Sequence, residues 1–497
     1  MQGRNAWIDN KSAINDSYIN THLIWRFMQF NSIAFIFVFL PLFLAVFKLV
    51  QAKSPHRILS VMGAASVLFY AAWSPYYLAL LFALAGINYG IGLRLQAQKS
   101  RSWLSAGIFL NVLNLAFFKY YYFASDTLHS IAGLQFPAAH IILPLGISFF
   151  TFQKIAYLCD CYRGSWKGKS FSEFFVFVFF FPQLIAGPIV HADQLIPQLR
   201  TATTNAANLY EGLVLFSIGL FKKAVLADTL ASYVTPAFAM TETGQTIDAA
   251  NAWFAVLSFS LQIYFDFSGY TDMARGLAKM IGITLPINFN SPYQSKSIIE
   301  FWRRWHITLS HWLRDYLYFP LGGARAGALK KYRNIAITML LGGLWHGAGW
   351  TYVLWGAIHG ALLILNHFWR STISGAKLRQ LAASKPYSLL CLVLTFIVVT
   401  LAWIAFRAPS LKGAQYMTRS LFDHNDHWME HVPSLLSFLV LLGALLGVVM
   451  FKNSNHLLER CARGTYTQMV MAVASAALFV CSIGLMSKGT PFIYFLF

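Results

Sequence analysis

Long apolar runs separated by short polar loops recur along the whole chain. A helix needs about 20 mostly apolar residues to cross the hydrocarbon core of a bilayer, so each such run predicts a membrane helix. The pattern predicts an all-α polytopic membrane protein with about 11–13 transmembrane or re-entrant helices. The predicted spans are residues 30–50, 58–73, 76–95, 103–124, 141–160, 171–190, 208–230, 252–283, 334–350, 351–369, 387–406, 434–451 and 467–487.

The basic residues of the loops predict the orientation of the chain. The loops after the second and fourth spans carry no Lys or Arg, whereas those after the first, third and fifth do. Because Lys and Arg are enriched in cytoplasmic loops, the N-terminus is predicted to lie outside. Beyond the sixth span the alternation is lost, as re-entrant segments would cause. The cytoplasmic set is Lys53, Arg57, Arg94, Lys99, Arg101, Arg163, Lys167 and Lys169.

Two apolar segments, Phe181–Ile189 and Leu285–Ser297, are interrupted by Pro, Gly and polar residues. Irregular backbone at membrane depth is tolerated only where it is buried in protein or lines a wet cavity. These segments therefore predict an internal cavity or tunnel. No internal repeat is visible, which argues mildly against an inverted-repeat transporter.

Composition agrees with a membrane protein and excludes some other classes. The chain of 497 residues is 57% hydrophobic and 11% charged, against about 25% charged in soluble domains. The net charge of +20 is spread over short loops, where it sets orientation and can contact anionic lipid headgroups, so we predict no nucleic-acid partner. The five cysteines form neither a disulfide framework nor a zinc motif.

Residues 1–27 form a polar N-terminal extension that precedes the first apolar run. Met28 opens that run and is an alternative native start, in which case the extension would not be native. The membrane domain is predicted to comprise residues 28–497.

The segment Phe301–Tyr316 is the first with candidate chemistry. Arg303, Arg304 and Arg314 are predicted to face polar surroundings, and His306 to border an apolar stripe. His306 is either a structural histidine of an interfacial amphipathic helix or a functional group. In a continuous helix the stripe consists of Trp302, Trp305, Leu309, Trp312, Leu313 and Tyr316.

His346 is the stronger candidate, because the surrounding segment Gly342–Gly360 is apolar enough to be embedded. An ionisable residue inside a membrane is a functional hypothesis by default. A neutral imidazole in an apolar site can act as a general base. The alternative is a structural histidine at a glycine-rich helix crossing. The neighbouring glycines, which allow close approach, are Gly342, Gly343, Gly347 and Gly349.

Other ionisable residues are less informative. Asp266 and Asp272 lie in Tyr264–Gly276 and are predicted to form buried ion pairs, with the arginines of residues 301–316 as partners. No metal site is predicted. The histidines without a setting like that of His346 are His311, His359 and the loop cluster His424, His427 and His431.

The C-terminal sequence PFIYFLF places Tyr494 three residues from the end. An aromatic terminus is most simply an interfacial anchor. A phenol that reaches a cavity could instead accept an acyl group transiently.

Several motifs together resemble the membrane-bound O-acyltransferase family from Met28 to Phe497. The resemblance is to its bacterial branch, which contains alginate and peptidoglycan O-acetyltransferases and teichoic acid D-alanyltransferases. The PLGG after His306 is more similar to the acetyltransferases, while residues 1–27 depart from the pattern. The motifs are PLGISFFTFQKIAY, FPQLIAGPI, FDFSGYTDMARG, NFNSPY, FWRRWHITLSHWLRDYLYFPLGG, LWHG and FIYFLF.

This resemblance implies a ring of helices around a thin centre, with a tunnel that joins a cytoplasmic donor to an outer acceptor. It places the near-invariant histidine of the family at His346 and its conserved Asn/His at His306. We therefore expect His346 to be the general base, and His306 to orient the donor or stabilise the oxyanion, an effect of about 3 kcal/mol.

The expected activity is transfer of an acyl group, with acetyl as the expected group, across the bacterial cytoplasmic (inner) membrane, which feeds O-acetylation of an extracytoplasmic glycan such as peptidoglycan or an exopolysaccharide. We expect no tightly bound cofactor, with acetyl-CoA or another acyl thioester as donor, attracted by Arg303, Arg304 and Arg314. An extracytoplasmic acyltransferase- or esterase-like partner would receive the group through Tyr494. The alternatives are D-alanyl transfer to teichoic acid, a proton-coupled transporter using buried histidines, and a passive scaffold.

Overall fold

The computed structural model describes residues 28–134, 136–137, 141–325, 327–373, 375–423, 435–450, 453–461, 464–486 and 492–493. These residues form helices and connecting segments and contain no strand, which confirms the all-α prediction.

The helices of the N-terminal half precede the segment that carries His306. They are η1 (Phe35–Phe39), α3 (Leu40–Lys53), η2 (Pro55–Arg57), α4 (Ile58–Ala71), α5 (Pro75–Ala97), α6 (Arg101–Leu115), η3 (Ala116–Tyr120), α7 (Tyr121–Ala132), α8 (Ile147–Arg163), α9 (Phe171–Phe179), α10 (Phe181–Leu184), α11 (Ala192–Arg200), α12 (Ala206–Phe221), η4 (Lys222–Ala227), α13 (Asp228–Glu242) and α14 (Ala249–Met280).

The remaining helices surround the junction that holds His306, and one of them ends at His346. They are η5 (Pro292–Gln294), α15 (Ile298–Arg304), α16 (Ile307–Leu313), η6 (Arg314–Tyr318), α17 (Ala328–His346), α18 (Trp350–Thr372), α19 (Gly375–Ala383), α20 (Lys385–Arg407), α21 (Leu411–Ser420), α22 (Leu435–Met450), α23 (Ser454–Cys461) and α24 (Thr465–Leu485).

Among the described residues, five helical stretches are long and apolar enough to cross a membrane by length and composition alone. The other predicted spans also contain helices, some of them shorter or interrupted, and how many of these are embedded stays a prediction. The predicted span 141–160 begins as a helix only at Ile147, because Gly146 adopts a left-handed conformation with φ of 74°. The five stretches are Phe35–Lys53, Pro75–Ala97, Arg101–Ala132, Lys385–Arg407 and Thr465–Leu485.

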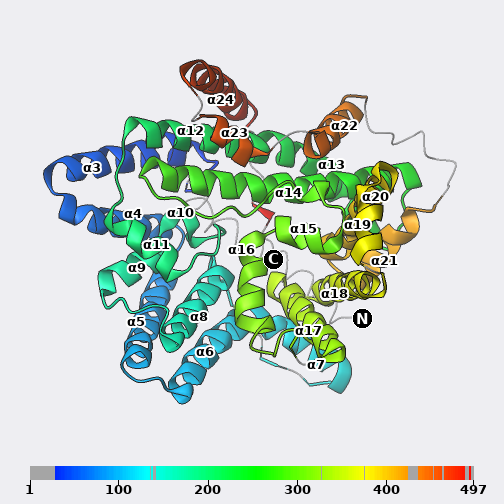
Figure 1. The fold of residues 1–497 in the computed structure, drawn as a ribbon, viewed down its shortest axis with the longest axis horizontal. Coiled ribbons are helices and arrows are strands. Elements are labelled where there is room, and N and C mark those ends of the chain that lie inside the picture. Colours follow the sequence, from blue (N-terminus) through cyan, green and yellow to red (C-terminus); the bar gives the residue numbers. More distant parts are fainter. Residues whose placement is uncertain are drawn as a thin grey trace.

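Helix α14 crosses the centre of the molecule, with α12 and α13 alongside it (Figure 1). Its close packing against α12 follows from glycines that face each other. A Cβ atom on Gly276 would lie 2.7 Å from the Gly212 carbonyl oxygen, and one on Gly269 would lie 2.7 Å from that of Gly219. Small residues at these crossings let the two backbones touch, and α14 thereby becomes the scaffold of the interior.

The two interrupted segments are irregular and largely buried, as their Pro and Gly content predicted. After α10 the chain through Val190 is non-helical, yet every residue of 185–190 is buried. Residues 285–297 contain only the short turn η5, and they pass beneath α14 to the start of α15 (Figure 1). Irregular backbone therefore lies inside the protein, whereas the tunnel itself stays a prediction.

Candidate active site

The backbone at His306 departs from the predicted continuous helix over residues 301–316. Helix α15 ends at Arg304 and α16 begins at Ile307, so that prediction is wrong at the junction. His306 has φ of 42° and ψ of 53°, a left-handed conformation that is uncommon for a residue other than glycine. Such strain costs about 1–3 kcal/mol and persists only where the surroundings enforce it.

A neighbouring segment enforces this break. The amide of Ile307 donates to the Asn288 carbonyl at 3.0 Å, and the amide of Asn290 donates to the Arg304 carbonyl at 2.9 Å. These two hydrogen bonds tie the strained junction to the irregular segment that precedes α15. Nothing within residues 301–316 could reveal the break, because the partner lies upstream.

Asn288 also determines which ring nitrogen of His306 carries the proton. Its Oδ1 accepts hydrogen bonds from the amide of Thr308 at 3.2 Å and from the Thr308 hydroxyl at 3.0 Å. A backbone N–H can only donate, so this atom of Asn288 is the oxygen. His306 Nδ1 lies 3.2 Å from the same oxygen and must therefore donate. In the neutral imidazole, Nε2 is then a hydrogen-bond acceptor.

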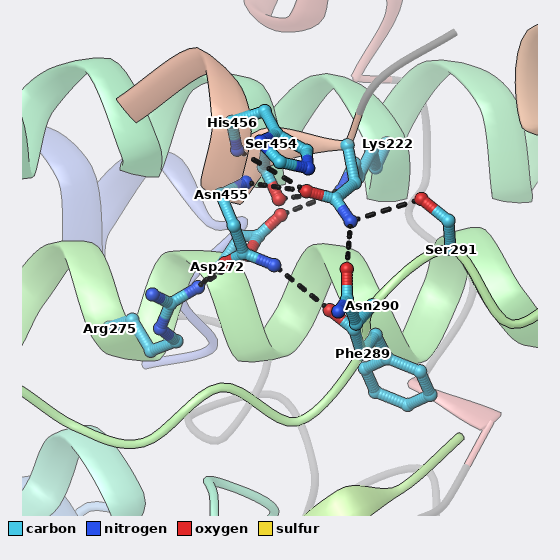
Figure 2. A network of polar contacts seen from close by, with 10 residues as sticks. Lys222, Asp272, Arg275, Phe289, Asn290, Ser291, Ser454, Asn455 and His456 are labelled. Carbon is cyan, nitrogen blue, oxygen red and sulfur yellow. Dashed lines mark hydrogen bonds and ion pairs between the residues drawn. The ribbon is translucent and has the colours of Figure 1, made fainter. Parts of the chain in front are cut away.

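A polar network holds residues 289–291 of the same segment (Figure 2). Asn453 donates to Asn290 Oδ1 at 2.7 Å and to Ser291 Oγ at 3.0 Å. Asn455 donates to the Phe289 carbonyl at 3.0 Å and accepts from Arg275 at 2.7 Å. Among the described residues other than glycine, only Ser291 and His306 have positive φ. The network therefore links α23 and α14 to the segment that holds His306.

His346 is the last residue of α17, and only 4% of its surface is exposed. Lys119 Nζ donates to the Trp345 carbonyl at 2.6 Å and to the His346 carbonyl at 3.0 Å. Tyr120 donates to the Leu344 carbonyl at 2.8 Å. A half-buried cation at the negative end of the helix satisfies carbonyls that otherwise lack partners. The sequence analysis missed both residues, which come from the π-helix η3.

The glycines near His346 serve helix packing more clearly than ligand access. A Cβ on Gly343 would lie 2.3 Å from the Tyr352 carbonyl oxygen, and one on Gly356 would lie 2.4 Å from that of Met339. These contacts bring α17 against α18. On Gly347 a Cβ would collide with the Tyr352 ring at 2.1 Å, so the space beside that glycine is occupied by protein.

The two candidate histidines lie close together although His306 belongs to the junction between α15 and α16 and His346 to the end of α17. The ring centroids of His306 and His346 are 6.3 Å apart. Trp345 contacts both, with centroid distances of 6.2 Å to His306 and 5.0 Å to His346. The remaining walls near His346 are Trp355 at 5.1 Å and Phe406 at 5.3 Å. The site is thus an aromatic interior with two imidazoles.

A third histidine, which the sequence analysis set aside, belongs to the same interior. His359 is fully buried on α18, and its ring centroid lies 4.6 Å from that of Trp355. The indole N–H of Trp302 donates to His359 Nδ1 at 3.2 Å. His359 lies 13 residues after His346, a spacing that forms no recognisable motif. Its partner Trp302 is 57 residues away in the sequence, so the local sequence around His359 could not reveal this hydrogen bond.

The arginines lie outside this interior. Arg303 and Arg314 are exposed, and Arg304 pairs with Glu300 at 2.7 Å. Arg314 hydrogen-bonds Asp315, which raises the pKa of its guanidinium and offsets its charge. The predicted stripe of Trp302, Trp305, Leu309, Trp312 and Leu313 is buried and Tyr316 is half-buried, which confirms the amphipathic pattern. Donor binding by the arginines stays a prediction.

The predicted arginine partners of the two aspartates are wrong. Asp266 pairs with Lys223 at 2.6 Å. Asp272 pairs with Lys222 at 2.7 Å and lies 3.5 Å from Arg275. Lys222 and Lys223 belong to η4, so these buried ion pairs join η4 to α14, in agreement with the predicted structural role. A pattern within 301–316 could not reveal these cations, which lie 50 and 43 residues before the aspartates that they pair with.

Comparison with known proteins decides the family. Residues 108–406 match the membrane-bound O-acyltransferase family. The chain is 42% identical to the probable alginate O-acetylase AlgI of Azotobacter vinelandii, over 80% of this chain and 79% of that protein. The chain belongs to the membrane-bound O-acyltransferase family.

Two further relatives place this membrane-bound O-acyltransferase within the family. It is 37% identical to a peptidoglycan O-acetyltransferase of Helicobacter pylori, over 95% of this chain and 98% of that protein. It is 30% identical to a teichoic acid D-alanyltransferase of Streptococcus thermophilus, over only 53% of this chain and 68% of that protein. The chain is therefore an O-acyltransferase enzyme bound to the membrane, on the O-acetyltransferase side of the family.

Tyr494 of this O-acyltransferase lies outside the described residues, but the two residues before it are described. The amide of Ile493 donates to Asp266 Oδ2 at 2.9 Å. Phe492 stacks on Tyr270 with centroids 4.5 Å apart and lies 5.8 Å from Phe267. Phe267 in turn lies 4.7 Å from His306. The chain just before Tyr494 is thus one aromatic ring away from the candidate site.

Metal binding finds no support in the described part of the O-acyltransferase. No group of three or more His, Cys, Asp or Glu residues there could hold a metal ion. The cluster His424, His427 and His431 lies outside the described residues.

Proposed function

We propose that this enzyme transfers an acetyl group from a cytoplasmic thioester donor, acetyl-CoA, to a hydroxyl group, as a multi-pass protein of a bacterial cytoplasmic membrane. The acetyl group then serves the O-acetylation of an extracytoplasmic glycan such as peptidoglycan or an exopolysaccharide. The observation that carries this proposal is the pair of buried imidazoles, 6.3 Å apart, in a chain similar to O-acetyltransferases.

The chemistry assigned to His346 is general-base catalysis. His346 takes the proton of the acceptor hydroxyl while the oxygen attacks the carbonyl carbon of the thioester. A C–O bond forms, the C–S bond breaks, and the leaving thiolate takes up the proton from the imidazolium. No cofactor beyond the donor is required. His306, whose Nε2 is an acceptor when the ring is neutral, orients a reacting group by receiving a hydrogen bond.

Tyr494 is proposed to be the first acyl acceptor. The hydrogen bond from Ile493 to Asp266 supports this role, because it holds the neighbouring backbone in the interior. The phenol ester would pass its acetyl group to an extracytoplasmic acyltransferase- or esterase-like partner, which would complete transfer to the glycan. Full glycan acetylation by Tyr494→Phe would rule out this intermediate.

Arg303 is the most suitable of the three arginines for attracting the phosphates of acetyl-CoA. It is exposed, whereas Arg304 and Arg314 already contact carboxylates. A guanidinium matches phosphate geometry well. Weaker binding of acetyl-CoA to Arg303→Gln, without a change in the maximal rate, is the expected sign of this role.

The decisive experiment compares wild type and His346→Ala in membranes supplied with radiolabelled acetyl-CoA. Label should reach protein or glycan in the wild type and fall to background in the variant, at equal amounts of folded protein. His311→Ala is the matched control, because His311 is an exposed histidine of α16. Equal labelling in His346→Ala would remove this residue from catalysis. No label in the wild type would favour another acyl donor, including the D-alanyl alternative, and then a transporter.

A further inference from the structure

Trp355 and His359 present two buried N–H groups on one face of α18. They are four residues apart, so they lie one helical turn from each other on the same side. Both residues have no exposed surface, and their ring centroids are 4.6 Å apart. Trp355 also lies 5.1 Å from the ring of His346. The pair is therefore next to the proposed base.

The proton of His359 is placed by its partner. Trp302 donates its indole N–H to His359 Nδ1 at 3.2 Å. An indole nitrogen can only donate, so Nδ1 is the acceptor and carries no proton. The imidazole is then neutral with its hydrogen on Nε2. His359 Nε2 is consequently a hydrogen-bond donor, the opposite of Nε2 in neutral His306.

Neither of these two N–H groups has a hydrogen-bond acceptor in the part of the chain that the structure describes. Leaving a buried donor without an acceptor is costly, and nearly all such groups in native proteins are satisfied by protein, water or a ligand. Trp302 makes the contrast clear, since its own indole N–H is satisfied by His359. Two unsatisfied donors beside the base indicate a ligand that supplies an acceptor oxygen.

We propose that Trp355 and His359 donate hydrogen bonds to the carbonyl oxygen of the acyl group. This assignment rests on the proposed acyltransferase function and deepens it. When the hydroxyl oxygen attacks, the C=O π electrons move to the carbonyl oxygen, and the two N–H groups stabilise the negative charge. The C–S bond then breaks as the C=O bond re-forms. Neither donor transfers its proton, because His346 carries the proton of the hydroxyl.

The test measures initial rates of acetyl transfer over a range of acetyl-CoA concentrations, using the full chain at equal membrane levels. Removing one donor to an oxyanion typically lowers kcat by about 100-fold or more. We expect this loss in His359→Leu and Trp355→Phe, with KM changed by less than about 3-fold, since donors used only in the transition state affect kcat. His359→Gln keeps an N–H donor and should retain at least about 10-fold more activity than His359→Leu.

Trp302→Phe separates a catalytic from a merely structural role. It leaves His359 in place and keeps an aromatic ring, but it removes the donor that holds the proton on Nε2. We expect kcat to fall by about 10-fold at unchanged KM, smaller than the loss for His359→Leu. If His359→Leu does not fold, Trp302→Phe alone decides the test. A wild-type kcat in Trp302→Phe then overturns the proposal.

Wild-type kcat in His359→Leu, or a loss confined to KM, would mean that water or ground-state packing satisfies the donors and would overturn the proposal. An active wild type with unaffected variants would reject this assignment alone. An inactive wild type would reject the proposed function and this assignment with it. His311→Leu, on the exposed side of α16, controls for the loss of any histidine.

Discussion

His306 and His359 differ in the partner that contacts Nδ1. Asn288 presents a carbonyl oxygen to His306, whereas Trp302 presents an N–H to His359. Both imidazoles are fully buried and would look alike in any sequence motif. The neutral ring of His306 is left with an acceptor at Nε2, and that of His359 with a donor. The role of a histidine thus follows from one hydrogen bond made by a residue distant in sequence.

The backbone conformations at His306 and His359 also differ. His359 lies within the regular helix α18, where ordinary helical hydrogen bonds determine its direction. His306 occupies a strained left-handed junction that exists only because residues 288–291 hold it. The junction should therefore be the more sensitive of the two to changes in its supports, which are Asn288 and, further away, Asn453.

Among changes to the residues that support the two histidines, the largest effect is expected for Asn288→Leu. This change removes the oxygen that accepts from His306 and Thr308 and leaves buried donors without partners, which costs about 1–3 kcal/mol each. We expect acetyl transfer to fall by about 100-fold, as for loss of a positioned catalytic group. Asn288→Asp keeps an acceptor oxygen and should retain activity within about 10-fold of wild type. Radiolabel transfer measures both, and equal activity of Asn288→Leu and wild type would contradict the assigned tautomer.

Lys119→Met should have an intermediate effect on acetyl transfer. It tests whether Lys119 positions His346 as Asn288 positions His306. The substitution keeps the length of the side chain but removes the ammonium that donates to two carbonyls at the end of α17. Hydrogen bonds to charged groups contribute about 1.5–3 kcal/mol, so we expect about a 10-fold slower transfer and a lower unfolding temperature.

Lys48→Met serves as the matched control for this substitution, because Lys48 is exposed on α3. Transfer by that variant should equal wild type. If Lys119→Met also transfers acetyl at the wild-type rate while unfolding at a lower temperature, Lys119 stabilises the fold without positioning His346.

Much of the helical framework could be predicted from the sequence, because apolar runs and their ends are local features. The predicted span 387–406 matches α20 (Lys385–Arg407), and 76–95 matches α5 (Pro75–Ala97). In each case Pro lies at the start of the helix, where its missing N–H is harmless. His346 and His306 could be singled out as candidates, since an imidazole in an apolar or glycine-rich segment is unusual on its own, and their catalytic roles stay predictions.

The features that failed prediction all depend on contacts between distant residues. Residues 301–316 keep a helical period throughout, so the break at His306 is invisible without Asn288. Lys222 and Lys223 could not be recognised as partners of the aspartates, because nothing in the predicted span 208–230 that contains them indicated that η4 packs against α14. His359 was set aside because its sequence setting did not match that of His346, and its hydrogen-bonding state depends on Trp302, across the fold.

The smallest effect on acetyl transfer is expected for Asn453→Ala. This variant tests whether a residue at the start of α23 helps to hold the junction at His306. Asn453 Oδ1 accepts from the amides of Asn455 and His456 at the start of α23, and its Nδ2 donates to Asn290 and Ser291. Loss of such a cap destabilises a helix by about 1 kcal/mol, so the unfolding temperature should fall by a few degrees. Because the strained junction depends on residues 288–291, acetyl transfer should also fall, by about 2- to 3-fold.

Asn205→Ala separates these two effects. Asn205 caps α12 by accepting from the amide of Asn208 at 2.8 Å, and it has no described contact with residues 288–291. Its loss should lower the unfolding temperature by a similar amount and leave transfer unchanged. If both variants reduce transfer equally, the effect of Asn453 is general destabilisation, and the network of Figure 2 does not position His306. If only Asn453→Ala does so, strain at the junction is maintained from α23.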